Sequence, residues 1–190
     1  MIKNILIVIA PLLLVAGCAS PAYNSDVYQG EHLITPYYAD VEDWLVSEQQ
    51  VNNFSSRIWQ QPGKGMADAY SVSVFYDQVS VTSQRRKRLD EPGLKACDTF
   101  TSTTLSFPQD LPYPVEYWET LCANNNGTRA KLLHLIIQGK NNLYHIQKSW
   151  QGDIPANLVQ QWKTKFETIF VCDTRTNVVE CPEVQKLTEL

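Results

Sequence analysis

The clearest alternation of apolar and polar positions runs from Ala130 to Trp150 and predicts a β-hairpin. A turn centred on Gly139–Asn142 sets Ile137 opposite Tyr144, Leu135 opposite Ile146 and Leu133 opposite Lys148. One face of this hairpin is then almost entirely apolar. The other, polar face carries His134 opposite Gln147 and Ile136 opposite His145, so the two histidines are diagonal neighbours.

A helical spacing of apolar residues follows the hairpin and predicts a helix that opens at Pro155. Its stripe comprises Leu158, Val159, Trp162, Phe166, Ile169 and Phe170. Proline is tolerated in the first turn because its missing N–H would have no partner there, and Asp153 complements the positive end of the helix dipole. We expect the stripe to cover the apolar face of the hairpin, with Lys163, Lys165 and Glu167 pointing outward.

Weaker patterns elsewhere complete the predicted fold. Residues 69–76 alternate as a half-buried strand, and Thr101 to Phe107 is rich in β-branched and aromatic residues, which favours a second strand. A short helix is predicted from Asp43 to about Asn53, and three prolines between Pro108 and Pro114 predict a loop. The predicted fold class is α+β, an antiparallel sheet of about four strands with the C-terminal helix packed on one face.

The N-terminus has the pattern of a secretory signal, with Lys3 followed by an apolar run from Ile5 to Val15. At about 17 Å as a helix, this run is too short for the roughly 30 Å of hydrocarbon in a bilayer. Its end, Val15-Ala16-Gly17-Cys18, resembles the lipobox of bacterial lipoproteins. The resemblance implies cleavage before Cys18, a diacylglyceryl group on its thiol and acylation of the new amine.

The residues after the cysteine refine the predicted location. Ala19 and Ser20 follow Cys18, without the aspartate that retains such lipoproteins in the inner membrane, so the resemblance implies the outer membrane, facing the periplasm. The sequence therefore predicts a signal peptide at residues 1–17, a lipidated flexible tether at 18–40 and one domain at 41–190. Acyl chains on Cys18 would anchor that domain, because each buried methylene contributes about 0.8 kcal/mol.

The charge balance argues against one class of partner. Without Lys3, fifteen basic residues oppose twenty acidic ones. Nucleic acid is excluded as an expected partner, because its binding needs a positive surface. Twenty aromatic residues, five of them tryptophan, supply either a core or the rigid anchors of an interface.

Four further cysteines predict two disulfides in the oxidising compartment that the signal implies. They are Cys97, Cys122, Cys172 and Cys181. Three connectivities remain open from the sequence alone. The nine-residue separation suits a local loop and favours Cys172 with Cys181, which leaves Cys97 with Cys122. A zinc site or a redox pair is disfavoured because the closely spaced CxxC pair is missing.

Candidate chemistry is sparse. His134 and His145 lack a third local metal ligand, so we expect surface or hydrogen-bonded histidines and predict neither a metal nor a cofactor. Glu116 and Glu119 beside Trp118 suggest a glycan cleft, but on a short helix such acids commonly face solvent. There is no Gly-x-Ser-x-Gly nucleophile motif.

One run of positive charge, Arg85-Arg86-Lys87-Arg88, stands out in the acidic chain. It suits anionic headgroups or an acidic partner, whereas the alternative is a solvated loop whose counter-charges and turn lie in Leu89–Gly93. Arg85, Arg86 and Arg88 are therefore candidate binding residues.

These features together predict a non-enzymatic binding or scaffold module whose partner is an envelope protein, active in envelope assembly or secretion. One alternative is an inhibitor or immunity protein of an envelope hydrolase, which would use the loop from Pro108 to Tyr117 with Tyr117 and Trp118 as contact residues. A second alternative is an envelope hydrolase with a pocket that joins His134 and His145 to a carboxylate.

Overall fold

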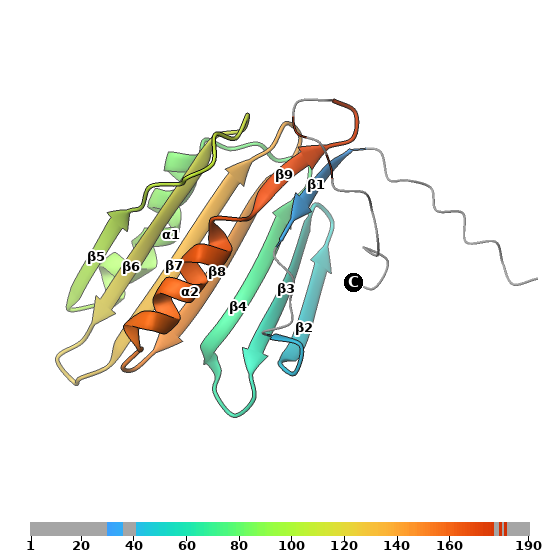
Figure 1. Ribbon diagram of the computed structural model, residues 1–190. Helices are drawn as coiled ribbons and strands as arrows, with labels where there is room; N and C mark the ends of the chain where they lie inside the picture. Colours follow the sequence, from blue (N-terminus) through green and yellow to red (C-terminus); the bar gives the residue numbers. More distant parts are fainter. Residues whose placement is uncertain (1–29, 36–40, 177–178, 180, 182–190) are drawn as a thin grey trace, which may run out of the picture.

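The computed structural model describes residues 30–35, 41–176, 179 and 181, and these form nine β-strands and two α-helices (Figure 1). The strands are β1 (Glu31–Ile34), β2 (Leu45–Val51), β3 (Phe54–Gln61), β4 (Gly65–Phe75), β5 (Thr99–Thr104), β6 (Val115–Ala123), β7 (Arg129–Gln138), β8 (Leu143–Gln151) and β9 (Phe170–Asp173). The helices are α1 (Thr82–Ala96) and α2 (Ala156–Phe166).

Seven of the strands form one antiparallel sheet in the order β2-β3-β4-β8-β7-β6-β5, and β1 pairs with β9 in a separate two-stranded sheet. The prediction of a sheet of about four strands is therefore wrong, and the described chain is mostly β-structure. The predicted hairpin is confirmed as β7 and β8, with Leu135 opposite Ile146 and Ile137 opposite Tyr144. Around it, β3, β4 and β6 extend the sheet in both directions.

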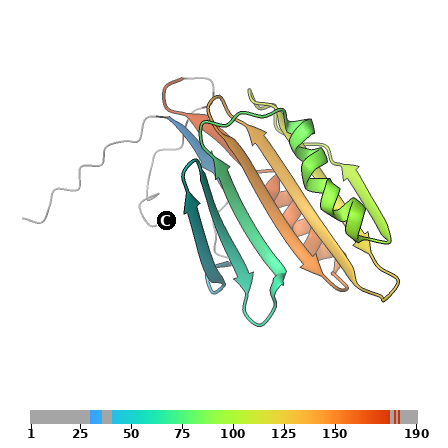
Figure 2. The same ribbon diagram turned by 180° about the vertical axis from the view of Figure 1, so that it is seen from behind.

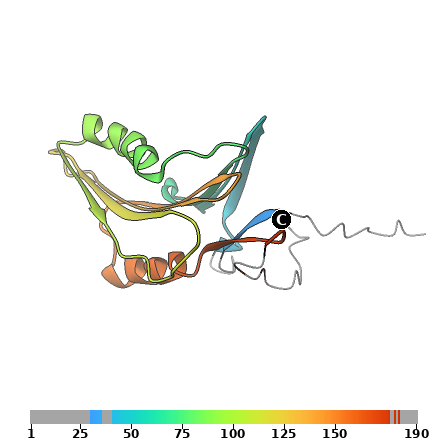
Figure 3. The ribbon, with the colours of Figure 1, turned by 90° about the horizontal axis from the view of Figure 1, so that it is seen from above.

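The two helices lie on opposite faces of the seven-stranded sheet, as the view from above shows (Figure 3). We call these the α1 face and the α2 face. On the α2 face, Trp162 and Phe166 pack into an apolar cluster with Leu135, Tyr144 and Ile146. This confirms the predicted helix and the hairpin face that it covers, although the helix ends at Phe166 and Phe170 begins β9.

Helix α1 covers the other face, over β5 and β6 (Figure 2). For the basic run within it, the sequence offers either a binding surface or a solvated loop with a turn, and predicts no helix. The helix is missed because its inward side is not an apolar stripe: Arg86 and Asp90 form hydrogen bonds with residues of the sheet. Pro92 also lies inside the helix. Gly93 permits a close approach of the helix to β5, since a Cβ atom there would overlap the ring of Phe100.

The segment from Asp43 to Asn53 is a strand and a turn rather than the predicted helix. Val51 pairs with Phe54 across Asn52 and Asn53, and Asn52 has a φ of 46°. Asparagine tolerates this left-handed conformation, which a two-residue hairpin turn needs. Pairing with β3 along the whole of β2 therefore overrides the short local pattern.

The first described strand, β1, lies within the segment that the sequence assigns to a tether ending at residue 40. Its Glu31 carboxylate accepts hydrogen bonds from three backbone N–H groups of the β7–β8 turn, those of Lys140, Asn141 and Asn142. A carboxylate over a nest of amides is a favourable arrangement, which fixes β1 to this end of the sheet.

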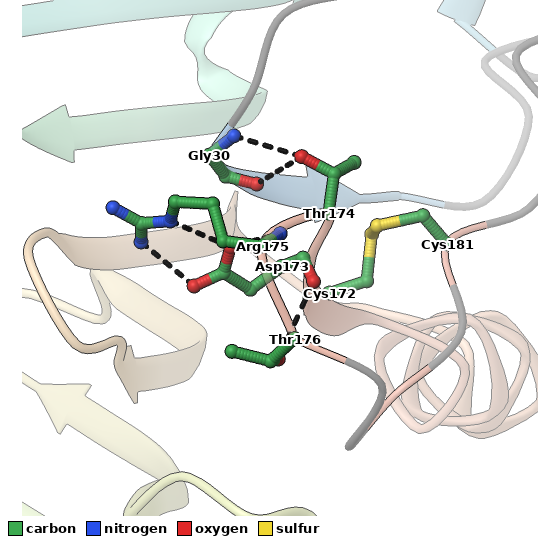
Figure 4. Close-up of a disulfide and its surroundings, with 7 residues drawn as sticks. All are labelled: Gly30, Cys172, Asp173, Thr174, Arg175, Thr176 and Cys181. Atoms are coloured by element: carbon green, nitrogen blue, oxygen red, sulfur yellow. Dashed lines mark hydrogen bonds and ion pairs between the residues drawn. A yellow bond between two sulfur atoms is a disulfide. The ribbon is translucent and has the colours of Figure 1, made fainter.

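Both predicted disulfide pairings are confirmed. Cys97, directly after α1, is bonded to Cys122 of β6, and Cys172 of β9 is bonded to Cys181. Figure 4 shows the second bond beside Asp173, whose carboxylate is ion-paired with Arg175 at 2.7 Å. Each bond closes a loop, which restricts the unfolded chain and stabilises the fold by about 2–4 kcal/mol.

The predicted signal segment and Cys18 lie outside the described residues. Of the helices that the structure describes, neither is long and apolar enough to cross a membrane.

Candidate functional site

The most exposed regular element is β2, at one edge of the seven-stranded sheet. Every one of its residues is exposed. Among these, Leu45 is 61% exposed, Val46 51% and Val51 53%. We call Leu45–Val51 the β2 edge. Its outer side offers backbone N–H and C=O groups to a further strand, because pairing with β3 uses only its inner side.

A cavity of about 350 Å³ lies on the α2 face next to the β2 edge. Val72, Val74 and Trp59 contribute apolar surface to it. The Arg57 guanidinium lies 5.7 Å from the centre of the Trp59 ring and is ion-paired with Glu48 of β2. We call this cavity the β2 pocket. The β2 pocket combines the apolar surface of Trp59, Val72 and Val74 with the Arg57–Glu48 ion pair, so it can accommodate a side chain of a strand bound at the β2 edge.

A second cavity, of about 430 Å³, lies at the other end of the sheet beside the start of α2. Its lining includes Thr99, Thr101, Leu121, Arg129 and Lys131. Neither of these two cavities is lined by His134 or His145.

The two histidines lie on the same face of the sheet, as the register predicts, but they are buried under α1. His134 Nδ1 is 3.3 Å from His145 Nε2, and the His134 ring stacks on Trp118 with ring centres 4.6 Å apart. Burial is the main cause that lowers the pKa of both rings, that of His145 to about 3. Both rings are therefore neutral at physiological pH. The expectation of surface histidines is wrong because both rings are buried, whereas the alternative of hydrogen-bonded histidines is confirmed by their contact with each other.

No metal-binding group forms around this pair: within the described part of the chain, no cluster of three His, Cys, Asp or Glu side chains is found. The hydrolase alternative requires a pocket that joins both histidines to a carboxylate. In the structure both rings are buried beneath α1, and His134 stacks on Trp118.

The basic run is divided by the helix that contains it. Arg86 points inward, where it donates hydrogen bonds to Thr104 Oγ1 at 2.7 Å and Ser102 Oγ at 2.9 Å and lies 3.5 Å from Glu116. Arg85 packs on the Phe75 ring, 4.2 Å from its centre. Lys87 and Arg88 are exposed. The run is therefore not a continuous basic surface, because half of it stabilises the contact between α1 and the sheet.

The paired acids of the suggested glycan cleft point to opposite faces. Glu116 and Glu119 are three residues apart in β6, and successive strand residues alternate between faces. Glu116 meets Arg86 on the α1 face, whereas Glu119 lies 2.9 Å from Lys163 Nζ on the α2 face. Two carboxylates on opposite sides of a sheet cannot flank one glycosidic bond, which excludes that cleft.

Tyr117 and Trp118, the candidate contact residues, lie in β6 and are buried, at 2% and 0% exposed. The Trp118 indole N–H donates to Asp90 Oδ1 at 3.1 Å, and burial raises the pKa of the Tyr117 hydroxyl. Their placement on an exposed loop is therefore wrong. The loop before β6 also packs against the α2 face, where its apolar side chains contact the apolar cluster: Leu105, Phe107, Leu111 and Tyr113.

One buried charge lies on the α2 face where the sequence predicts an almost wholly apolar surface. The Lys148 ammonium lies between three indole rings, 4.9 Å from Trp44, 4.7 Å from Trp150 and 5.1 Å from Trp162. Its counter-charge is Asp68 of β4. Burial lowers the pKa of Lys148 to about 8 despite this partner.

Sequence reasoning missed the β2 edge, although one signal for it was present. Asn52 and Asn53 separate two runs of strand-like residues, which is the pattern of a two-residue hairpin.

The sequence matches neither a family model nor a curated protein, so no relative supplies a function.

Proposed function

We propose that this chain is a lipid-anchored, non-enzymatic binding module that pairs with another polypeptide along the β2 edge. The observation that carries the proposal is the exposure of β2 along its whole length, with three large apolar side chains facing solvent. An extended segment laid against such an edge gains main-chain hydrogen bonds, and its side chains find neighbours on both faces.

The β2 edge lacks the features that normally protect an edge strand. It contains no lysine, arginine or proline, and its one charge, Glu48, is ion-paired with Arg57 of the neighbouring strand. The opposite edge differs, because β5 is mostly threonine and serine and its one large apolar residue, Phe100, packs against Gly93 of α1. Among the described residues, the apolar and unprotected edge of the sheet is therefore the one at β2.

The inhibitor and hydrolase alternatives have less support. The loop proposed for an inhibitor turns its apolar side chains toward the core, and the histidine pair of a hydrolase lies beneath α1. The pattern at Cys18 and the two disulfides support anchoring in an oxidising compartment, which we propose to be the periplasmic side of the outer membrane.

Site-specific photocrosslinking in intact cells tests the binding role. With a photoreactive amino acid at Gln49, on the β2 edge, we expect a covalent adduct of defined size. The same amino acid at Gln160, an exposed position of α2, is the matched control and should give none. Absence of an adduct from Gln49, or equal adducts from both positions, would contradict the proposal.

Replacement of the lipidated residue tests the anchor separately. We expect Cys18→Ser to abolish incorporation of labelled palmitate and to move the protein from the membrane to the soluble periplasmic fraction, because the acyl chains supply the membrane affinity. A Cys18→Ser variant that stays in the membrane fraction would show that another feature holds it there.

A further inference from the structure

We infer that the polypeptide bound at the β2 edge is a second copy of this chain, joined to the first by antiparallel pairing of β2 with β2. This inference rests on the proposed function and names its partner. A two-fold symmetric contact uses the same surface on both copies, so the surface must be complementary to itself. The sequence of β2 meets this condition in one register.

That register places the two Glu48 residues opposite each other at the symmetry axis. Leu45 of each copy then lies opposite Val51 of the other, and Ser47 lies opposite Gln49. These pairs share the α1 face, because successive residues of a strand alternate between faces. The two most exposed apolar residues of β2, Leu45 and Val51, thus form two symmetry-related pairs across the contact, and the polar pairs of Ser47 with Gln49 lie between them.

Two contacts on the α2 face are less favourable in this register: Glu48 lies opposite Glu48, and Val46 lies opposite Gln50. The structure already compensates for the like charges. On β3, Arg57 is the direct neighbour of Glu48 and forms an ion pair with it. The axis would therefore carry two carboxylates and two guanidinium groups, which together have no net charge. Trp59 lies beneath each guanidinium and helps to hold it in place.

The symmetry also agrees with a shared membrane. When two antiparallel strands continue one sheet, the two-fold axis runs perpendicular to the sheet, so both copies keep the same face on the same side. β1, the first described strand after Cys18, packs with β9 on the α2 face through Leu33 and Val171 (Figure 3). In both copies, the segment that connects Cys18 to β1 therefore joins the domain on the α2 face. The twelve residues between Cys18 and Glu31 span at most about 45 Å, so both acyl anchors can reach one membrane.

Cysteine crosslinking tests both the partner and the register. In the full-length, membrane-bound protein, cells that express Ser47→Cys together with Gln49→Cys are expected to give a disulfide-linked dimer under mild oxidation. Either variant expressed alone should crosslink much less, since Ser47 faces Gln49 of the other copy. Equal crosslinking by the single variants would overturn this register, and no dimer in any combination would overturn the inference.

Sedimentation of the purified protein in detergent measures the strength of the contact. We expect Leu45→Lys/Val51→Lys to raise the dimer dissociation constant by at least about tenfold, because four lysines would meet in the paired edge. Leu94→Lys changes an equally exposed leucine on α1 and should leave the constant unchanged. If both variants dimerise like the unchanged protein, the dimer does not use the β2 edge and the inference is wrong.

Failure of this inference can be told apart from failure of the proposed function. A monomer whose Gln49 photoadduct contains a different protein would overturn the second copy but keep the β2 edge as the binding site. A monomer without any adduct would overturn both.

Discussion

Acidification from about pH 6.5 to about pH 4.5 is expected to lower the free energy of unfolding by up to about 5 kcal/mol through His134 and His145 alone. Both rings are buried and neutral in the folded chain, with the pKa of His145 lowered to about 3. In the unfolded chain they titrate near about pH 6.5. Below that pH the unfolded state binds more protons, so stability is lost by up to about 1.4 kcal/mol per pH unit for each ring.

Urea denaturation across this pH range measures the effect, and a variant without the two rings isolates it. We expect His134→Phe/His145→Leu to show a much shallower dependence on pH, whatever its stability at neutral pH. His32→Gln, on β1 and outside the buried pair, is the matched control for the loss of a histidine, and the slope of the double variant is compared with its slope. An unaltered slope in the double variant would show that other groups control the acid sensitivity.

Replacement of Asp68 by asparagine is expected to lower the free energy of unfolding by about 3 kcal/mol at neutral pH. The substitution keeps the size of the side chain but removes the counter-charge of Lys148, whose side chain is fully buried between three tryptophan rings. The ammonium must then either remain buried without a partner or lose its proton. Both outcomes cost free energy that the paired state avoids.

The pH dependence of this loss distinguishes a charge effect from a packing effect. The pKa of Lys148 is already lowered to about 8, and loss of Asp68 lowers it further. We therefore expect the penalty of Asp68→Asn to shrink as the pH rises from about 7 to about 10, because a neutral amine needs no counter-charge. Asp153→Asn, at a 99% exposed carboxylate, should change stability by less than about 0.5 kcal/mol. A penalty that is constant with pH would contradict this account.

Local periodicity predicted the parts of the fold that long runs of residues specify. The β7–β8 register follows from one turn and a strict alternation, and α2 follows from an apolar stripe several turns long. The disulfide between Cys172 and Cys181 follows from a short loop between them. In each case the partners are near in sequence, so the local pattern contains the information.

Two elements were predicted wrongly because their patterns were short or polar. Helix α1 has charged residues on its inward side, and those charges are satisfied only by β5 and β6, so hydrophobic periodicity does not reveal it. Strand β2 has too few alternating residues to be distinguished from a helix without its partner β3.

The candidate residues show the same division. Tyr117 and Trp118 are of the residue types that are enriched in interfaces, but β6 lies between two other strands under both helices, so both side chains are buried in the core. Glu116 and Glu119 looked paired by spacing, and strand geometry separates them. Conversely, Leu45 and Val51 are exposed because none of the described strands lies on the outer side of β2, and no local pattern predicts this.

The sequence by itself determined the central hairpin and the C-terminal helix with its buried face. It favoured one of three disulfide connectivities, which the structure confirms, and it predicts the lipid anchor at Cys18, outside the described residues. Only the tertiary structure decided the number and order of strands, the burial of the two histidines and the pairing of Lys148 with Asp68, eighty residues away. The physical reason is that periodicity fixes which side of an element is apolar, whereas contacts between distant segments fix what covers that side. The exposed β2 edge also depends on contacts between distant segments, because the order of all the strands decides which strand lies at the edge of the sheet.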